Sequence, residues 1–329
     1  FMLTRDREFY KSFFGLMLVV ALQNLLAYSV NMADNLMLGT YSQVSLSGAA
    51  TVNQIQFMVQ QVGIALTTGM VMINSQYWGR REMAPIRRNT WVALSIGLSI
   101  GAVLLAVTSV FPRALLRIFS TDAAIIGEGL RYLEIIRFTY LLYIATTIML
   151  GALRSVETVK IAFWVSLCSV IINVGINYTL IFGNFGFPEL GIRGAAIGTI
   201  TARAVELAIV LGYMLREKKL QLFCGGLFRF GREDLKAYIK VTAPAIGANL
   251  IWSMSTPIQG AILGHLSDDA IAANSISSTF YSYLKVIVSS EASAAGGAVG
   301  DSFRAVLMVI VASGLGMLPI ALSTGIGFL

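Results

Sequence analysis

The sequence predicts an all-α, polytopic membrane protein, and three observations lead to that fold class. Of the 329 residues, 56% are hydrophobic and 12% are charged, with a mean hydropathy of +0.75. An ordinary soluble domain carries about 25% charged residues, so this composition excludes a soluble globular enzyme and a disordered chain. The second observation is a series of long apolar segments, and the third is an internal repeat.

Nine segments are long enough to cross the hydrocarbon core as helices, which takes about 20 apolar residues. They lie at 12–37, 50–74, 89–111, 131–152, 160–183, 193–215, 239–263, 270–295 and 303–329. Segments of this length are too long for the strands of a membrane barrel. The basic N-terminus runs straight into the first of them, so we expect no cleavable signal peptide.

The connections between these segments alternate in charge. One side of the predicted membrane holds 17 basic residues: Arg5, Arg7, Lys11, Arg80, Arg81, Arg87, Arg88, Arg154, Lys160, Arg216, Lys218, Lys219, Arg229, Arg232, Lys236, Lys240 and Arg304. The other side holds 4: Arg113, Arg117, Arg131 and Arg193. Basic residues accumulate in cytoplasmic loops, so this asymmetry predicts a cytoplasmic N-terminus.

An internal repeat predicts two lobes. The segment at 35–50 aligns with the segment at 260–275, so that Gly39 matches Gly264. Six helices precede the second block, which makes the repeat parallel, with its axis along the membrane normal. We expect a six-helix lobe at 1–218, a cytoplasmic linker at 219–238 and a second lobe at 239–329. The second lobe has three helices where the first has six, and we interpret it as incomplete.

The linker interleaves basic residues with large apolar ones. This composition is typical of an amphipathic segment that lies on an anionic membrane surface. A plain basic linker is the alternative.

Four stretches carry a family resemblance: MADNLMLGTYSQVSLSGAA, SQYWGRRE, NVGINYTLIFGNFGFPELGIRGAAIGT and ILGHLSDDAIAANSI. With them the chain resembles the multidrug and toxic compound extrusion (MATE) family along its whole length. The resemblance implies twelve helices in two six-helix lobes around a central cavity. It also implies export of cationic, amphipathic compounds in exchange for H⁺ or Na⁺. The chain departs from the family by lacking the last three helices.

Asp34 is an acidic residue near the outer end of the first predicted helix. Asn24, Ala27, Asn31 and Asp34 follow three- and four-residue steps and therefore share one helix face. A carboxylate there either faces an enclosed cavity and binds a proton or Na⁺, or is a solvated acid at the helix end. The resemblance implies that Asp34 is the ion-coupling residue, and Na⁺ is the only metal ion we expect it to bind.

The fifth predicted helix carries a polar stripe of Ser166, Ser169, Asn173 and Asn177. Amide oxygens can coordinate a hard cation or bind a carboxylic acid, and hydrogen bonding between helices is the alternative. By resemblance, Asn173, Asn177 and Thr199 surround Asp34. Some relatives have a second acid where Asn177 stands, so a single carboxylate does the coupling here.

The second predicted helix repeats the pattern, with polar residues at seven-residue intervals. They are Asn53, Gln60, Thr67 and Asn74, with Gln56 alongside. Such a stripe faces protein or water, so it lines a cavity or packs between the lobes. We assign to the substrate cavity Asn31, Asn53, Gln56, Gln60, Tyr28 and Tyr140. Aromatic rings bind organic cations, and contact with lipid is the alternative for the two tyrosines.

Arg203, Glu206 and Glu291 are further charged residues within predicted spans. Arg203 and Glu206 stand three apart, close enough for a structural ion pair, with a role in transport as the alternative. Glu291 has no basic residue three or four positions away. It is either an ion-coupling residue of the second lobe or an acid in contact with water.

The leading functional hypothesis is a secondary active antiporter of the cell membrane that exports organic cations by alternating access. We expect a monomer without cofactor or nucleic acid. The sequence holds no G-x-x-x-x-G-K-[ST] loop, so the chain itself is not an ATP-driven pump. The alternative is a lipid-linked saccharide flippase of the same superfamily, which tends to place several cations in its cavity. A membrane-embedded hydrolase would need a catalytic pair, which the single His265 does not supply.

Overall fold

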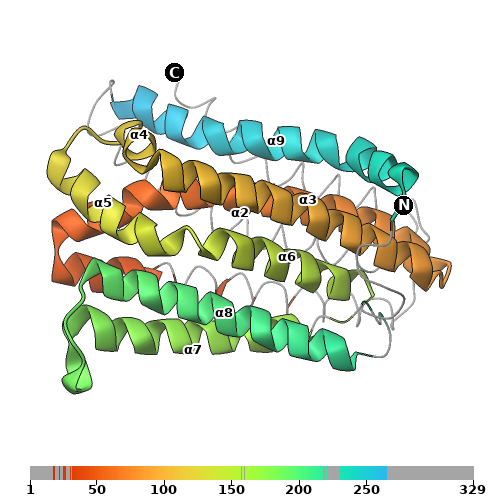
Figure 1. The fold of residues 1–329 in the computed structure, drawn as a ribbon, viewed down its shortest axis with the longest axis horizontal. Helices are drawn as coiled ribbons and strands as arrows, with labels where there is room; N and C mark the ends of the chain where they lie inside the picture. Colours follow the sequence, from red (N-terminus) through yellow and green to blue (C-terminus); the bar gives the residue numbers. More distant parts are fainter. Residues whose placement is uncertain are drawn as a thin grey trace, which may run out of the picture.

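The computed structural model of the protein describes residues 32–156, 158, 160–217, 220, 222 and 230–264, with isolated positions 18, 22, 25, 26 and 30. Of residues 250 and 252–264 it describes the backbone alone. Long helices run side by side along one axis (Figure 1). They are α2 (Gln43–Gly79), α3 (Met83–Val110), α4 (Pro112–Arg117), α5 (Ala123–Ile136), α6 (Thr139–Ser155), α7 (Lys160–Phe182), η1 (Asn184–Gly186), α8 (Ile192–Arg216) and α9 (Arg232–Gly264). No strand occurs among the described residues.

Most of the predicted spans correspond to these helices. Four described helices are long and apolar enough to cross a membrane, namely α2, α3, α7 and α8, and the bent pair α5–α6 makes a fifth. The predicted span at 239–263 lies within α9. The last two predicted spans, 270–295 and 303–329, lie outside the described residues, as do most of 12–37 and of the linker. The all-α, multi-pass class is confirmed.

A single residue, Ser42, separates the first helix from α2. Its backbone is extended (φ −163°, ψ 130°), and its hydroxyl accepts a hydrogen bond from the Ser45 amide, which caps the start of α2. The first helix continues through Tyr41. Asp34 therefore lies about two turns inside that helix, and not at its end.

The fourth predicted span, 131–152, is not one straight helix, because α5 and α6 meet at an angle of 50°. At the bend the Thr139 hydroxyl donates a hydrogen bond to the Ile136 carbonyl at 2.6 Å. The Phe138 amide bonds the carbonyl three residues back, at Ile135. These contacts satisfy backbone groups that a straight helix would pair differently. Neither proline nor glycine marks the break, so the apolar pattern predicted a continuous helix.

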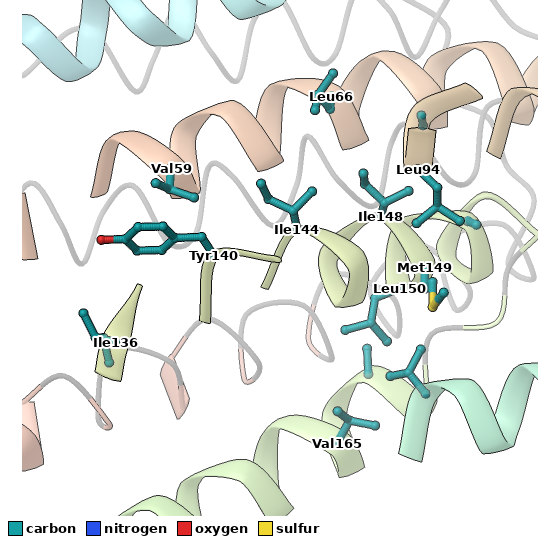
Figure 2. Close-up of a cluster of buried hydrophobic side chains, with 14 of the residues drawn as sticks. Val59, Leu66, Leu94, Ile136, Tyr140, Ile144, Ile148, Met149, Leu150 and Val165 are labelled. Carbon is teal, nitrogen blue, oxygen red and sulfur yellow. The ribbon is translucent and has the colours of Figure 1, made fainter. Parts of the chain in front are cut away.

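The hydrophobic core lies between α2, α3 and α6 (Figure 2). Leu66, Leu94, Ile144 and Ile148 interdigitate there, and none is more than 2% exposed. Gly97 of α3 lets the helices approach, since a Cβ there would lie 2.7 Å from Ile144 and Ile148. Lipid solvates apolar side chains as well as protein does, so close packing holds these helices together.

The contact between α2 and α9 is also close. The Tyr238 hydroxyl donates a hydrogen bond to the Leu66 carbonyl at 2.7 Å, and a Cβ at Gly69 would collide with the Thr242 side chain. Ahead of α9, Leu222 of the predicted linker is buried, and its carbonyl accepts a hydrogen bond from Nε1 of Trp91 at 3.2 Å. This part of the linker packs on α3. For the rest of the linker, an amphipathic surface segment remains a prediction, and so do the lobe boundaries.

Candidate functional site

The structure brings Asp34 together with residues of α7 and α8. Nδ2 of Asn177 donates a hydrogen bond to Oδ1 of Asp34 at 2.5 Å and to Oδ1 of Asn173 at 3.3 Å. Nδ2 of Asn173 in turn donates to Oγ1 of Thr199 at 3.3 Å. A chain of hydrogen bonds therefore runs from the first helix across α7 to α8. We call Asp34, Asn173, Asn177 and Thr199 the Asp34 cluster.

Close packing of α7 on α8 positions the two amides. Asn173 and Asn177 are one turn apart on α7, and both are fully buried. Facing them, Gly198 leaves room for Asn177, because a Cβ there would collide with Oδ1 of that amide. Gly194, one turn away on α8, lies against the backbone of Leu180. The two glycines therefore let the helices approach to the distance at which the cluster forms.

The cluster contains an unused acceptor. Oδ1 of Asn177 is buried without a hydrogen-bond partner among the described residues, while Nδ2 of the same amide holds Asp34. A buried carboxylate is costly unless a proton or a cation neutralises it. Carboxylate and amide oxygens are suitable ligands for a hard cation and suitable acceptors for an acid proton. The atom types of the cluster therefore suit either ion.

A small cavity of about 50 Å³ opens beside the cluster. Its polar lining comes from Ser166, Ser169, Asn173, Thr199, Arg203 and Glu206. One water molecule needs roughly 10–15 Å³, so the cavity has room for a few waters. The predicted stripe of the fifth span thus faces the same space as the charged pair of α8.

Arg203 and Glu206 form the ion pair that their spacing predicts. Nη1 of Arg203 donates to Oε2 of Glu206 at 2.7 Å, and the Glu206 side chain is 7% exposed. The guanidinium carbon of Arg203 lies 5.3 Å from the ring centroid of Tyr143 on α6, a cation–π contact. Arg203 is also close enough to interact electrostatically with Asp34.

The family model for MatE matches residues 20–179, the stretch that holds Asp34, Asn173 and Asn177. Over this stretch the chain resembles the MatE family. The "Probable multidrug resistance protein NorM" of Thermotoga maritima is 28% identical over 255 residues, which cover 77% of this chain and 54% of that protein. The "Uncharacterized transporter YisQ" of Bacillus subtilis is 25% identical over 253 residues, covering 77% and 55%. The chain thus spans about half the length of these curated relatives.

Solved structures share the fold. The crystal structure of MATE in complex with MaL6 superposes with a TM-score of 0.81 at 16% identity, over 93% of this chain and 68% of that one. At this identity the likeness shows the fold alone. It agrees with the predicted all-α, multi-helix fold.

The polar stripe of the second predicted span has two parts in the structure. Asn53, Gln56 and Gln60 are half-buried on α2. Further along, Nδ2 of Asn74 donates to Oγ1 of Thr90 on α3 at 3.3 Å, and Thr67 lies against Gly151 of α6. The far half of the stripe therefore packs between helices of the same bundle.

The remaining predicted site residues are less informative. Tyr140 lies fully buried in the hydrophobic core (Figure 2). It is not among the residues that line the small cavity. The other predicted residues lie outside the described part of the chain: Tyr28, Asn31, His265 and Glu291.

Sequence reasoning missed Tyr132. This residue of α5 is 4% exposed, and its phenol contacts the Thr199 hydroxyl. Nothing in the sequence distinguishes it from the other aromatic residues of the predicted spans. Its place beside the cluster follows from the way α5 crosses α8, which only the fold reveals.

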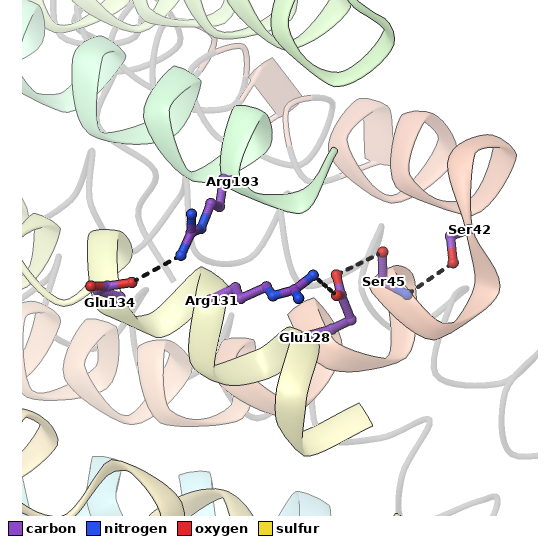
Figure 3. Close-up of polar contacts among 6 residues, drawn as sticks. All are labelled: Ser42, Ser45, Glu128, Arg131, Glu134 and Arg193. Atoms are coloured by element: carbon purple, nitrogen blue, oxygen red, sulfur yellow. Dashed lines mark hydrogen bonds and ion pairs between the residues drawn. The ribbon is translucent and has the colours of Figure 1, made fainter. Parts of the chain in front are cut away.

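A second group of polar contacts joins α2, α5 and α8 at the end of the bundle where α2 begins (Figure 3). The Ser45 hydroxyl donates to Oε2 of Glu128 at 3.1 Å, and Nη1 of Arg131 donates to Oε1 of Glu128 at 2.7 Å. Arg193 of α8 lies 3.5 Å from Glu134. Ser45, Glu128, Arg131 and Arg193 line a groove of about 870 Å³.

Proposed function

We propose that the protein is a secondary active antiporter of the cell membrane, which exports organic cations in exchange for H⁺ or Na⁺ with Asp34 as the coupling carboxylate. The observation that carries this proposal is the Asp34 cluster. A carboxylate inside the bundle is held by neutral amides and lies next to a polar cavity. Intramembrane acids of this kind mark ion pathways.

Coupling follows from competition for one negative charge. The amides of Asn173 and Asn177 orient Asp34 without supplying a positive charge. A substrate cation or the coupling ion can therefore neutralise the carboxylate, but not both at once. When H⁺ or Na⁺ binds, the attraction that holds the substrate is lost and the substrate leaves.

The ion gradients supply enough free energy for such a cycle. One unit of pH difference provides about 1.4 kcal/mol per proton, and 100 mV of potential provides about 2.3 kcal/mol per charge. Two pH units plus 100 mV give on the order of 5 kcal/mol per proton. Exchange of one proton for one monovalent cation gains nothing from the potential, because no net charge moves.

The charges around the cavity favour the antiporter over the lipid-linked saccharide flippase. A flippase cavity has to attract a pyrophosphate, which requires uncompensated cations. Among the described lining residues the cation is Arg203, and Glu206 already neutralises it. Asp34 adds a negative charge, which attracts cations.

The positions of the basic residues support a cytoplasmic N-terminus. The turn between α2 and α3, the end of α6, the start of α7 and the end of α8 lie at one end of the bundle (Figure 1), and they carry Arg80, Arg81, Arg154, Lys160 and Arg216. Protease cleavage at Arg229 or Lys236 in intact right-side-out cells would contradict this orientation.

The proposal is tested by efflux of ethidium from vesicles that contain the full-length protein, with the pH gradient and the Na⁺ gradient imposed separately. We expect one of the two gradients to drive efflux. Asp34→Asn should reach the membrane in normal amount and lose gradient-driven efflux. Glu128→Gln, which removes an acid outside the Asp34 cluster, at the end of the bundle where α2 begins, is the matched control and should pump normally. Efflux at the wild-type rate in Asp34→Asn would overturn the proposal and shift attention to Glu291.

A further inference from the structure

We propose that the Arg203–Glu206 pair sets the charge of the cavity so that the Asp34 cluster exchanges one monovalent ion for each monovalent substrate cation. This inference rests on the proposed function, since it requires Asp34 to be the coupling carboxylate. Arg203 acts through Asp34 and is a positioning residue.

The first step is location. Arg203 and Glu206 line the same cavity as Asn173 and Thr199, which belong to the Asp34 cluster. Arg203 reaches Glu206 at 2.7 Å, lies over Tyr143, and is near enough to Asp34 for electrostatic interaction. The pair therefore lies next to the cluster that holds the coupling carboxylate.

The second step is a count of charges. The ionisable groups in and around this space come from four elements. Arg203 and Glu206 of α8 line it. Asp34 of the first helix belongs to the adjoining cluster, Tyr132 of α5 contacts Thr199, and Tyr143 of α6 contacts Arg203. The two phenols are neutral near pH 7. Two carboxylates and one guanidinium leave a net charge of −1 among these described residues. One monovalent cation neutralises it.

The third step is a comparison with the other arginine–glutamate pair of the same geometry. Arg131 and Glu128 on α5 have the same three-residue separation and the same 2.7 Å contact, but Arg131 is 62% exposed and lies at the end of the bundle. The Arg203–Glu206 pair is more enclosed, with side chains 25% and 7% exposed. A buried pair contributes little net stability compared with neutral residues of similar size. Stability alone therefore does not account for two charges at this place.

The experiment measures ethidium binding to the purified full-length protein in detergent, as a function of pH without Na⁺ and as a function of Na⁺ at fixed pH. The slope of log Kd against the logarithm of the coupling-ion concentration gives the number of ions displaced per ethidium, because the two ligands are thermodynamically linked. We expect a slope of one for the wild type. A single charge at about 10 Å changes the affinity for a cation by about tenfold.

The variants separate charge from structure. Arg203→Gln leaves a net charge of −2, so ethidium should bind about tenfold more tightly, with a slope that approaches two. Glu206→Gln leaves no net charge and should weaken binding about tenfold. Arg203→Lys and the double variant Arg203→Gln/Glu206→Gln both keep the net charge at −1. Both should bind within about threefold of the wild type with a slope of one. Neutralising Arg131 and Glu128 together is the matched control and should change neither quantity.

The possible results are distinguishable. If Arg203→Gln and Glu206→Gln weaken binding alike and the slope stays at one in both, the pair is structural and the inference is overturned. If Arg203→Gln does not fold, a slope other than one in the double variant or in Arg203→Lys overturns it equally. Asp34→Asn tests the proposed function separately: an unchanged affinity and slope in that variant contradict Asp34 as the coupling residue, whatever the pair does.

Discussion

Asn177 donates a hydrogen bond of 2.5 Å to the carboxylate of Asp34, and this contact joins the first helix to α7 across 143 positions of sequence. The end of the first helix is held at a second level by Tyr41, whose ring lies edge-on to Phe182 at 6.5 Å and against Gly191. Two contacts thus fix the last two turns of this helix on the α7–α8 hairpin.

Removing the amide should impair coupling more than folding. Asn177→Ala deletes the donor to Asp34 and to Asn173, and the loss of buried hydrogen bonds costs about 1–3 kcal/mol. We expect the variant to reach the membrane with a reduced ratio of ethidium exported to ions taken up, measured in vesicles. Asn173→Ala should behave in the same way. Asn184→Ala removes an amide of the exposed α7–α8 loop and should be neutral. If both cluster variants only abolish expression, the amides serve helix packing alone.

Gly198→Ala should reproduce the effect of Asn177→Ala without removing a polar atom. The added Cβ would collide with Oδ1 of Asn177, so the amide must rotate away from Asp34 or α8 must move off α7. Gly212→Ala is the matched control on the same helix, because nothing lies within 4 Å of its added Cβ. An alanine in a helix interior is favoured over glycine by roughly 0.5–1 kcal/mol. Thermal unfolding in detergent and vesicle efflux should therefore separate the two variants. Normal coupling in Gly198→Ala would show that the Asn177 contact is dispensable.

The spacing of polar residues predicted which of them share a helix face, but not which residues that face contacts. Steps of three and four placed Asn173 and Asn177 on one side of a helix, while their meeting with Asp34 and Thr199 came from the family resemblance. The bend at residues 137–138 had no sequence signal, because a threonine hydroxyl and a single tight turn replace the usual glycine or proline.

Packing between different helices decides the surroundings of polar and linker residues that the sequence could not assign. Thr67 and Asn74 belonged to a polar stripe that fitted a cavity wall and an interhelical contact equally well. The contacts that distinguish the two are made by Gly151 of α6 and Thr90 of α3, which lie on other helices. In the same way, the burial of Leu222 depends on Trp91, 131 positions earlier.

The contact of Tyr41 with the α7–α8 loop should be sensitive to alkali. Burial raises the pKa of Tyr41 above its ordinary value of 10, and the hydrogen bond to Glu189 and the negative charges of Glu189 and Glu128 raise it further. A raised pKa means that the folded protein favours the neutral phenol. This stabilisation is fully present below pH 10 and is lost as the pH rises through the shifted value.

Two variants test this contact, with unfolding temperature measured between pH 8 and pH 11 and phenolate absorbance followed in parallel. Tyr41→Phe keeps the ring on Gly191 and should lose part of the alkaline destabilisation. Glu189→Gln should shift titration of Tyr41 toward lower pH. Identical alkaline profiles for the wild type and Tyr41→Phe would contradict the assignment.

The contact between α2 and α9 should report on the separation of the two lobes. A Cβ at Gly69 would collide with the side chain of Thr242, so cysteines at these positions can form a disulfide after a small helix shift, since a disulfide needs Cα atoms about 4.4–6.8 Å apart. In a background with Cys168→Ser and Cys224→Ser, we expect Gly69→Cys/Thr242→Cys to cross-link on mild oxidation. Gly69→Cys/Gly247→Cys should not cross-link, because nothing lies within 4 Å of a Cβ added at Gly247. If α9 moves with the second lobe, oxidation should stop ethidium efflux and reduction should restore it. Full cross-linking with undiminished efflux would mean that α2 and α9 stay together throughout the cycle, and the lobe boundary would then lie after α9.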